Sequence, residues 1–251
     1  MDISYAWFSC TGGRSGNQDV IGHVVAEGHA CFVVSDGIAG EPGGEVAAQC
    51  AVNHILAYGS ARPMTSVAIE ACIRDANDAI LAEQARDARN QKMGATVVAL
   101  FIDRTARTAQ WAHLGDSRLY HFRRGVLIHR TRDDSLLQRM ADAGLPFDGI
   151  SPNLLDRALG VHGDITPCVS PIESLHDGDA FLLCTDGLWH AVPDASIEQH
   201  LRIVNKVDDW LSLLRHAVSH QHTHGAPMDN YSALAVWAGR PEDVTLQRIK
   251  E

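Results

Sequence analysis

Runs of apolar and β-branched residues recur along the whole chain and are separated by short polar or glycine-containing links. Runs of this kind are typical of β-strands. They occupy residues 3–9, 20–25, 30–35, 95–103, 108–114, 117–122, 125–129, 165–169, 179–184 and 231–238. The pattern therefore predicts a protein with many strands.

Segments with apolar residues at helical spacing lie between these runs. Residues 43–58 and 65–90 form one neighbouring pair, and residues 197–203 and 207–220 form a second pair near the C-terminus. A shorter helix is predicted from Ser135 to Ala143. In 65–90 the apolar residues approximate one stripe, which is what a helix packed on one face requires. The predicted helices thus come in sequential pairs.

The links between the predicted strands from 95 to 129 are very short: DRTART, GDS and RRG. Such links suit an antiparallel meander and argue against repeated crossover helices. The sequence therefore predicts an α+β fold. The turn-rich connection from Gly144 to Asp164 is either a mobile flap or an ordinary surface excursion.

Composition narrows the class of protein. With 45% hydrophobic and 21% charged residues, the chain has a globular and not a disordered composition. The 21 Lys and Arg against 31 Asp and Glu give a net charge of −10, which excludes general nucleic-acid binding. No apolar stretch reaches the roughly 20 residues that span a bilayer, and the N-terminus lacks an export signal. We expect a cytoplasmic protein without membrane insertion, with its six scattered cysteines reduced.

Three aspartates stand shortly after predicted strands. Asp36, Asp116 and Asp186 each follow a strand-like run, although Asp-Gly alone is a common turn dipeptide. Strand ends at one edge of a sheet can converge, and converging carboxylates repel unless a cation neutralises them. Oxygen ligands suit Mg²⁺ or Mn²⁺, whereas zinc would call for His or Cys. The recurrence therefore predicts a hard divalent-cation site.

Three further residues fit this prediction. Asp229 directly precedes the last strand-like run and Asp19 precedes the second one. Arg14 stands in a glycine-rich segment shortly before Asp19, where its planar donors would suit a phosphate. Taken alone, an arginine in such a segment is more often an ordinary surface residue.

Histidines form a rival metal site. His216 and His220 are four residues apart on a predicted helix, and His222 and His224 follow. This spacing can place two rings on one zinc ion. Because no glutamate completes an H-E-x-x-H arrangement, we favour a solvated helix end and loop.

Eight motifs in order resemble those of the metal-dependent protein phosphatase family, also called protein phosphatase 2C, over nearly the whole chain. GGRSGNQD is similar to the first family motif, VVSDGIAGEPGGEVAA to the Asp-Gly metal motif, and MGATVV to the Met-Gly-Thr-Thr motif. HLGDSRLY resembles the Gly-Asp-Ser-Arg motif and TRDDSLLQRM the Thr-x-Asp-His-Ser segment. LLDRALG, LLCTDGLW and MDNYSALAV resemble the Arg-Ala-Leu-Gly, second Asp-Gly and final Asp-Asn motifs.

The resemblance implies one domain over residues 1–251, a four-layer α-β-β-α sandwich of two antiparallel sheets flanked by helices. It also implies that Asp36 bridges two Mn²⁺ or Mg²⁺ ions, that the Gly37 carbonyl binds one of them, and that Asp186 and Asp229 hold the other. Asp116 would join Asp186 at a weaker third metal. The nucleophile would then be a metal-activated water, which two cations position for in-line attack on phosphorus.

The resemblance further implies that Arg14 clamps the phosphate, while Asp19 and Asn230 support the ligands and their waters. Gln18 departs from the family, which usually has Glu there, so a carboxylate becomes an amide that hydrogen-bonds waters or ligates weakly. Ile38 and Asp134 stand where family members carry a histidine, which leaves the leaving-group acid open. Ala39 and Ala95 replace a usual Gly and Thr, changes that we expect to be structural.

Two functions follow. The first is a protein-serine/threonine phosphatase that acts on phosphorylated proteins and opposes a protein kinase, for example in a secretion system or the cell envelope. The second is a non-catalytic phosphoprotein-binding or sensor module with a weakened metal site, for which Gln18 is the support. Hydrolysis of a phosphate ester with added Mn²⁺ separates them.

Overall fold

Two antiparallel sheets form the centre of the computed structural model, which describes residues 1–38, 43–59, 65–146, 151, 154–221 and 228–239. The first sheet joins, in spatial order, β1 (Ile3–Cys10), β11 (Tyr231–Ala238), β10 (Asp179–Cys184), β6 (Arg118–Arg123) and β7 (Val126–Arg130). The second joins β2 (Asp19–Val25), β3 (His29–Asp36), β4 (Val97–Asp103), β5 (Thr108–Leu114) and β8 (Cys168–Val169), and β9 (Glu173–Ser174) also pairs with β5.

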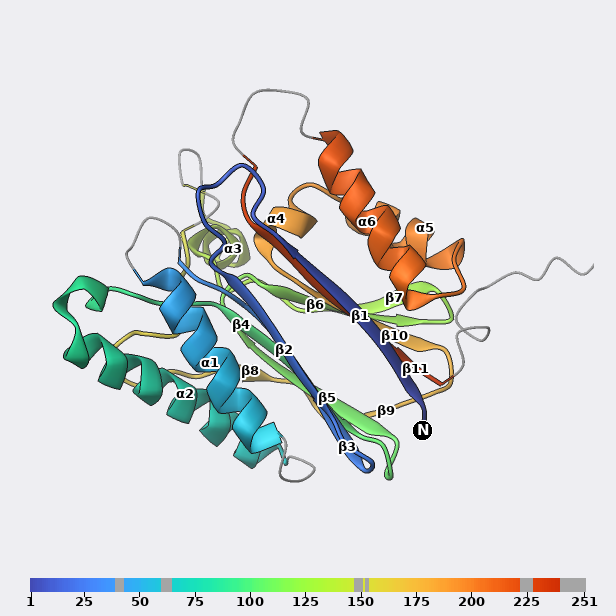
Figure 1. The fold of residues 1–251 in the computed structure, drawn as a ribbon, viewed down its shortest axis with the longest axis horizontal. Helices are drawn as coiled ribbons and strands as arrows, with labels where there is room; N and C mark the ends of the chain where they lie inside the picture. The colour runs from blue at the N-terminus through green and yellow to red at the C-terminus, as the bar shows by residue number, and fades with distance from the viewer. Residues whose placement is uncertain (39–42, 60–64, 147–150, 152–153, 222–227, 240–251) are drawn as a thin grey trace, which may run out of the picture.

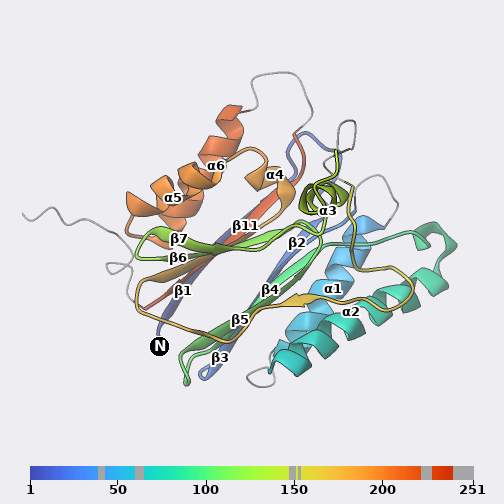
Figure 2. The ribbon, with the colours of Figure 1, turned by 180° about the vertical axis from the view of Figure 1, so that it is seen from behind.

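Helices cover the outer face of each sheet (Figures 1 and 2). The helices α1 (Gly44–Gly59) and α2 (Ser66–Arg86) pack on the second sheet, and α5 (Asp194–Arg202) and α6 (Val207–Gln221) pack on the first. The short helices α3 (Leu136–Asp142) and α4 (Asp186–Trp189) lie between the two helical layers at one end of the sandwich. The predicted four-layer α-β-β-α fold and its paired helices are confirmed.

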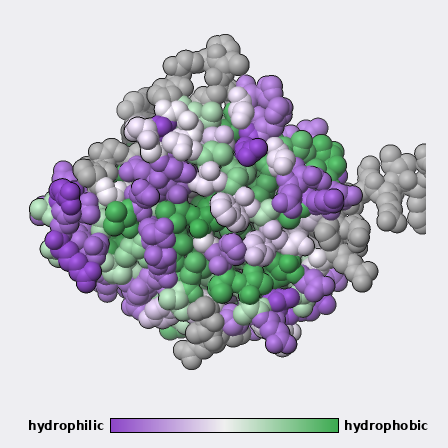
Figure 3. All heavy atoms as spheres, viewed as in Figure 1, coloured by the Kyte–Doolittle hydropathy of each residue, from purple (hydrophilic) through white to green (hydrophobic). Residues whose placement is uncertain are grey.

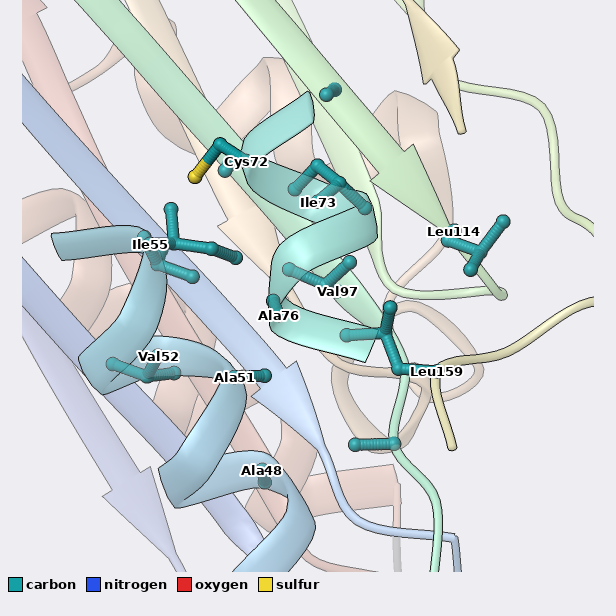
Figure 4. Close-up of a cluster of buried hydrophobic side chains, with 14 of the residues drawn as sticks. Ala48, Ala51, Val52, Ile55, Cys72, Ile73, Ala76, Val97, Leu114 and Leu159 are labelled. Atoms are coloured by element: carbon teal, nitrogen blue, oxygen red, sulfur yellow. The ribbon is translucent and has the colours of Figure 1, made fainter. Parts of the chain in front are cut away.

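Three apolar layers hold the sandwich together. In the layer shown in Figure 4, Ala48, Val52 and Ile55 of α1 and Ile73 of α2 meet strand residues such as Val97. Between the sheets, alternate residues of each strand point inward, for example Phe32, Leu100, Phe181 and Leu234. Burial of one apolar face per helix and both faces per central strand explains the dense runs in the sequence.

The surface reflects this layering. In Figure 3, hydrophilic side chains lie mainly toward the margins, while hydrophobic ones gather near the centre of this face and in a smaller patch at the upper right. No helix among the described residues has both the length and the apolar content needed to cross a bilayer.

Several predicted boundaries are wrong. The predicted meander is interrupted because β5 belongs to the second sheet and β6 to the first, so the chain changes sheets at Gly115–Ser117. Gly115 has φ +106°, and a Cβ there would lie 2.7 Å from the Thr96 side chain, so this crossing requires glycine. The helix predicted over 65–90 ends at Arg86, where Asp87 is extended and caps a short 3₁₀ turn (Ala88–Asn90).

The strand predicted at 165–169 is reduced to the two residues of β8, while β9 and α4 were not predicted at all. Of the connection from Gly144 to Asp164, residues 147–150 and 152–153 lie outside the described residues. Its later part is tied to the core, because Leu155 pairs with Ser135, and the fully buried Leu159 pairs with Ala95. A flap in this connection stays a prediction.

Candidate active site

Two aspartates meet at paired strand ends. Asp19 begins β2 and Asp36 ends β3, and the antiparallel register makes them direct partners. Such partners project on one face of the sheet with Cβ atoms about 5 Å apart. Asp19 is 7% exposed, and its Oδ1 atom has no hydrogen-bond partner among the described residues. The pair therefore places negative charge and an unused acceptor at one end of the second sheet.

The first sheet adds Asp186, the first residue of α4. Directly before it, Thr185 donates through Oγ1 to Asp19 Oδ2 at 2.9 Å, and the same oxygen accepts the Ser232 backbone N–H at 3.0 Å. These bonds connect the ends of β2, β10 and β11. Thr185 was not assigned a role from the sequence. Its position directly before the second Asp-Gly could have indicated one.

Asp116 comes from the loop between β5 and β6. The Thr96 hydroxyl accepts the Asp36 backbone N–H at 3.0 Å and is hydrogen-bonded to Ser117 Oγ at 2.7 Å. On the other side, the Trp189 indole N–H donates to the Asp116 carbonyl at 3.0 Å. The loop is thus fixed from both sheets by residues that sequence reasoning did not identify.

Electrostatic repulsion marks these carboxyl groups as one cluster. Burial, followed by the charges of Asp19, Asp186, Asp116 and Asp229, raises the pKa of Asp36 well above its usual value. Burial is also the main reason that the pKa of Asp116 rises to about 7 and that of Asp19 to about 6. For Asp186, burial raises the pKa while the nearby His190 opposes the rise. Without a cation, the cluster would therefore retain protons near neutral pH.

Asp229 and Asn230 lie just before β11 and face the loop of residues 11–18. Asp229 Oδ2 accepts from the Arg14 guanidinium at 2.8 Å. The Asn230 amide accepts the Gln18 backbone N–H at 2.9 Å and donates to the carbonyls of residues 11 and 16 at 2.8 and 2.9 Å. The expected phosphate clamp and an expected metal ligand are thus ion-paired, and Asn230 uses its amide to hold the loop.

Gly37 is closely packed. A Cβ at this position would lie 2.3 Å from the Gly44 backbone at the start of α1, so only glycine fits. Its N–H donates to the Gln18 carbonyl at 3.1 Å. The Gln18 side chain lies over Gly44, where a Cβ would be 2.8 Å from Nε2. Gln18, which stands where the family usually has Glu, therefore lies at the edge of the site, beside Gly37, the residue expected to supply a carbonyl ligand.

The other departures occupy different places. Ile38 is half-buried and Ala95 is fully buried, where it pairs with Gly37 and Leu159, as a structural role requires. Asp134 forms an ion pair with Arg157. Ala39 lies outside the described residues.

The rival histidine site is only partly described. The rings of His216 and His220 are 4.2 Å apart in an edge contact, while His222 and His224 lie outside the described residues. Another histidine is closer to the carboxylates: His190 Nδ1 is 3.7 Å from Asp186 Oδ2. The burial of Cys31 and Cys184 raises the pKa of both thiols, which argues against a cysteine nucleophile there.

A cavity of about 650 Å³ opens over the loop of residues 14–18 and the segment that carries Asp229. Arg14, Gln18 and Asp229 line one side, and Asp87 and Arg89 line another. Arg14 is 44% exposed along its side chain, so its guanidinium is accessible to a ligand in this cavity. The cavity therefore exposes Arg14 and Asp229 together to a ligand from solvent.

These residues fit a hard divalent cation. The converging donors are carboxylate oxygens, they repel one another, and Asp19 Oδ1 is buried with no described partner. Oxygen donors of this kind are what Mg²⁺ and Mn²⁺ prefer. Fold and site together define the class: a sandwich of two sheets with a carboxylate cluster at the strand ends that fits a divalent cation, and an arginine suited to phosphate beside Asp229.

The chain belongs to the protein phosphatase 2C family, whose model matches residues 9–137. The serine/threonine protein phosphatase PstP of Mycobacterium tuberculosis is 31% identical over 197 residues, 76% of this chain. The chain covers only 37% of the length of that relative. The serine/threonine phosphatase stp of Listeria welshimeri is 30% identical over 217 residues, 81% of this chain and 82% of that protein.

A solved structure gives the same result. The catalytic domain of PstP in complex with two manganese ions superposes with a TM-score of 0.78 at 26% identity, covering 94% of this chain and 98% of that one. The resemblance predicted from the sequence is therefore confirmed, and so is the family's dependence on a divalent metal as a property of this class of protein.

Proposed function

We propose that this chain is a protein-serine/threonine phosphatase that hydrolyses phosphoserine and phosphothreonine and opposes a protein kinase. The observation that carries the proposal is the convergence of Asp19, Asp36, Asp116 and Asp186 from the ends of two sheets. Burial is the main cause of the raised pKa of each group, and the charges of neighbouring carboxylates add to it. The named relatives are serine/threonine phosphatases, which supports the same activity here.

In this proposal, Asp36, the Gly37 carbonyl, Asp186 and Asp229 would hold two Mn²⁺ or Mg²⁺ ions. Asp116 serves a third, weaker ion. When bound, the ions supply an activated water for attack on phosphorus and offset charge on the phosphoryl oxygens. The two-ion assignment is supported by the manganese complex of PstP.

The chain's own residues bind and orient the substrate. Arg14 holds the phosphoryl oxygens in the cavity, and it can do so once Asp229, its present partner at 2.8 Å, turns to a cation. Thr185 keeps Asp19 in place from the other sheet, and Trp189 fixes the loop that carries Asp116. These contacts preserve the arrangement of carboxylates during turnover.

The alternative is a non-catalytic phosphoprotein-binding module. Its support is Gln18, which lines the cavity as a neutral amide. The enzyme is favoured because the buried carboxylates have a use only if cations are bound, whereas phosphoprotein binding would need no such repulsive cluster.

The deciding experiment is hydrolysis of a phosphothreonine peptide by metal-free protein to which Mn²⁺ is added. We expect metal-dependent release of phosphate, lost in Asp36→Asn and kept in Asp208→Asn, an exposed aspartate of α6. Binding of the phosphopeptide without hydrolysis would favour the alternative. A kinase partner in a secretion system or the cell envelope is a narrower proposal, which a phosphoproteome comparison with and without the gene tests.

A further inference from the structure

A second polar cluster lies on the outer edge of the second sheet, formed by His113, Asp134, Cys168 and Arg157. The register of β5 and β8 makes His113 and Cys168 direct partners. Asp134 approaches from the segment before α3, where its backbone N–H donates to the Gly115 carbonyl at 2.9 Å. One ligand atom each of His113, Asp134 and Cys168 lie within 4.8 Å of one another.

His113 is in the form that binds metals. Its Nε2 atom is 2.8 Å from the Arg132 carbonyl, which can only accept, so Nε2 carries the proton. The neutral ring then has a lone pair on Nδ1, which is buried and has no hydrogen-bond partner among the described residues. The residue is 6% exposed, and burial lowers its pKa, which keeps the ring neutral. Metal-ligating histidines usually donate their other N–H to a carbonyl or carboxylate in this way.

Asp134 is oriented in a similar way. Its Oδ2 accepts the Gly115 N–H at 3.2 Å, which leaves Oδ1 to face the Arg157 guanidinium. The same guanidinium nitrogen is 3.5 Å from Cys168 Sγ. A positive charge thus already lies beside the carboxylate and the sulfur. Arg157 is 39% exposed along its side chain, so it can move toward solvent.

We propose that His113 Nδ1, Asp134 Oδ1 and Cys168 Sγ form a binding site for a Zn²⁺-type transition-metal ion, separate from the carboxylate centre. Nitrogen, sulfur and one carboxylate oxygen are the donors that zinc prefers, and they differ from the oxygen donors around Asp36. The ion takes the place of the Arg157 guanidinium, the Cys168 thiol releases its proton to solvent, and water supplies the fourth ligand.

The geometry permits this exchange. Zinc bonds of about 2.0 to 2.3 Å put neighbouring ligand atoms roughly 3.3 to 3.8 Å apart. The three atoms, now within 4.8 Å, therefore need to close by about 1 Å, which side-chain rotation provides. A cavity of about 220 Å³ lined by His113, Asp134, Arg157 and Cys168 gives the ion access from solvent.

The test uses the full chain, stripped of metal and titrated with Co²⁺. Cobalt replaces zinc in such sites and gives a sulfur-to-cobalt charge-transfer absorption only when a thiolate is a ligand. We expect this band in the wild-type protein and its disappearance when Zn²⁺ is added. Cys168→Ser should lose the band, whereas Cys50→Ser, which changes another half-buried thiol, should keep it.

Two further variants test the remaining partners. His113→Gln should weaken Zn²⁺ binding at least about tenfold in a chelator competition, and Arg157→Gln should strengthen it because the competing cation is gone. Asp36→Asn should keep the cobalt band while losing phosphatase activity, so failure of one site is distinguishable from failure of the other. No band in the wild type, or a band that survives Cys168→Ser, would overturn the proposal. Circular dichroism verifies that each variant is folded.

Discussion

Removing one charge from the carboxylate cluster should stabilise the metal-free protein. Asp116→Asn keeps the size of the side chain but removes its charge. Burial, followed by the charges of Asp186 and Asp133, raises the pKa of Asp116 from 3.8 to about 7. At about 1.4 kcal/mol per tenfold change in proton affinity, this difference corresponds to roughly 4 kcal/mol of destabilisation once the group is ionised.

The sign of the pH dependence follows from the direction of this shift. The folded protein holds the Asp116 proton to a higher pH than the unfolded chain does, so stability is lost as pH rises from about 4 to about 7. The gain from Asp116→Asn should therefore be roughly 4 kcal/mol at about pH 8.5 and below about 1 kcal/mol near pH 4. Saturating Mn²⁺ should remove the gain, because a cation bound at Asp116 would offset both the cost of burying its charge and the repulsion from Asp186 and Asp133.

Urea unfolding of both proteins in chelator, at the two pH values, measures this difference. Asp208→Asn is the matched control, because this aspartate is exposed on the first turn of α6. We expect it to change the free energy of unfolding by less than about 0.5 kcal/mol at either pH. A loss of stability in Asp116→Asn at high pH, or a gain that does not depend on pH, would refute the reasoning.

Three other outcomes are expected. Asp36→Asn and Asp186→Asn should abolish Mn²⁺-dependent hydrolysis while the circular dichroism spectrum persists; retained activity would remove these residues from the centre. Arg14→Ala should raise KM for a phosphopeptide more than it changes metal affinity, with partial recovery in Arg14→Lys, and an unchanged KM would make Arg14 an ordinary surface residue. Gln18→Glu should lower the Mn²⁺ concentration for half-maximal activity about fivefold, from a net gain of about 1 kcal/mol. A Mn²⁺ titration of hydrolysis that showed no change or a weaker dependence would place residue 18 away from the metal.

The ion pair between Arg14 and Asp229 links the proposed phosphate site to the proposed metal site. Arg14 and Asp229 are 2.8 Å apart, although one is assigned to phosphate and the other to a cation. A divalent ion on Asp229 would release Arg14, so metal and phosphate binding should support each other. Because the Arg14 side chain is exposed, breaking its ion pair with Asp229 costs little free energy.

Local pattern determined much of this protein. The strands β3, β4, β10 and β11 are buried along nearly their whole length. Their continuous apolar runs therefore predicted strands from the local sequence, before any pairing partner was known. The stripe in α2 likewise follows from one buried face. The motif order identified the family, and with it the four layers and the aspartates at the strand ends.

Only the tertiary structure decided which distant residues contact one another and how far the pKa values of the carboxyl groups are shifted. The link GDS fits a hairpin as well as a change of sheet. At the observed change of sheet, Gly115 lies against the side chain of Thr96, the residue directly before β4. The Thr185–Asp19 bond joins residues 166 apart, and no local spacing encodes it. His113 and Cys168 are far apart in the sequence and become neighbours through the register of a two-residue strand. The pKa of Asp116 depends on burial and on the charges of Asp186 and Asp133, which follow β10 and β7, and these are properties of the folded chain alone.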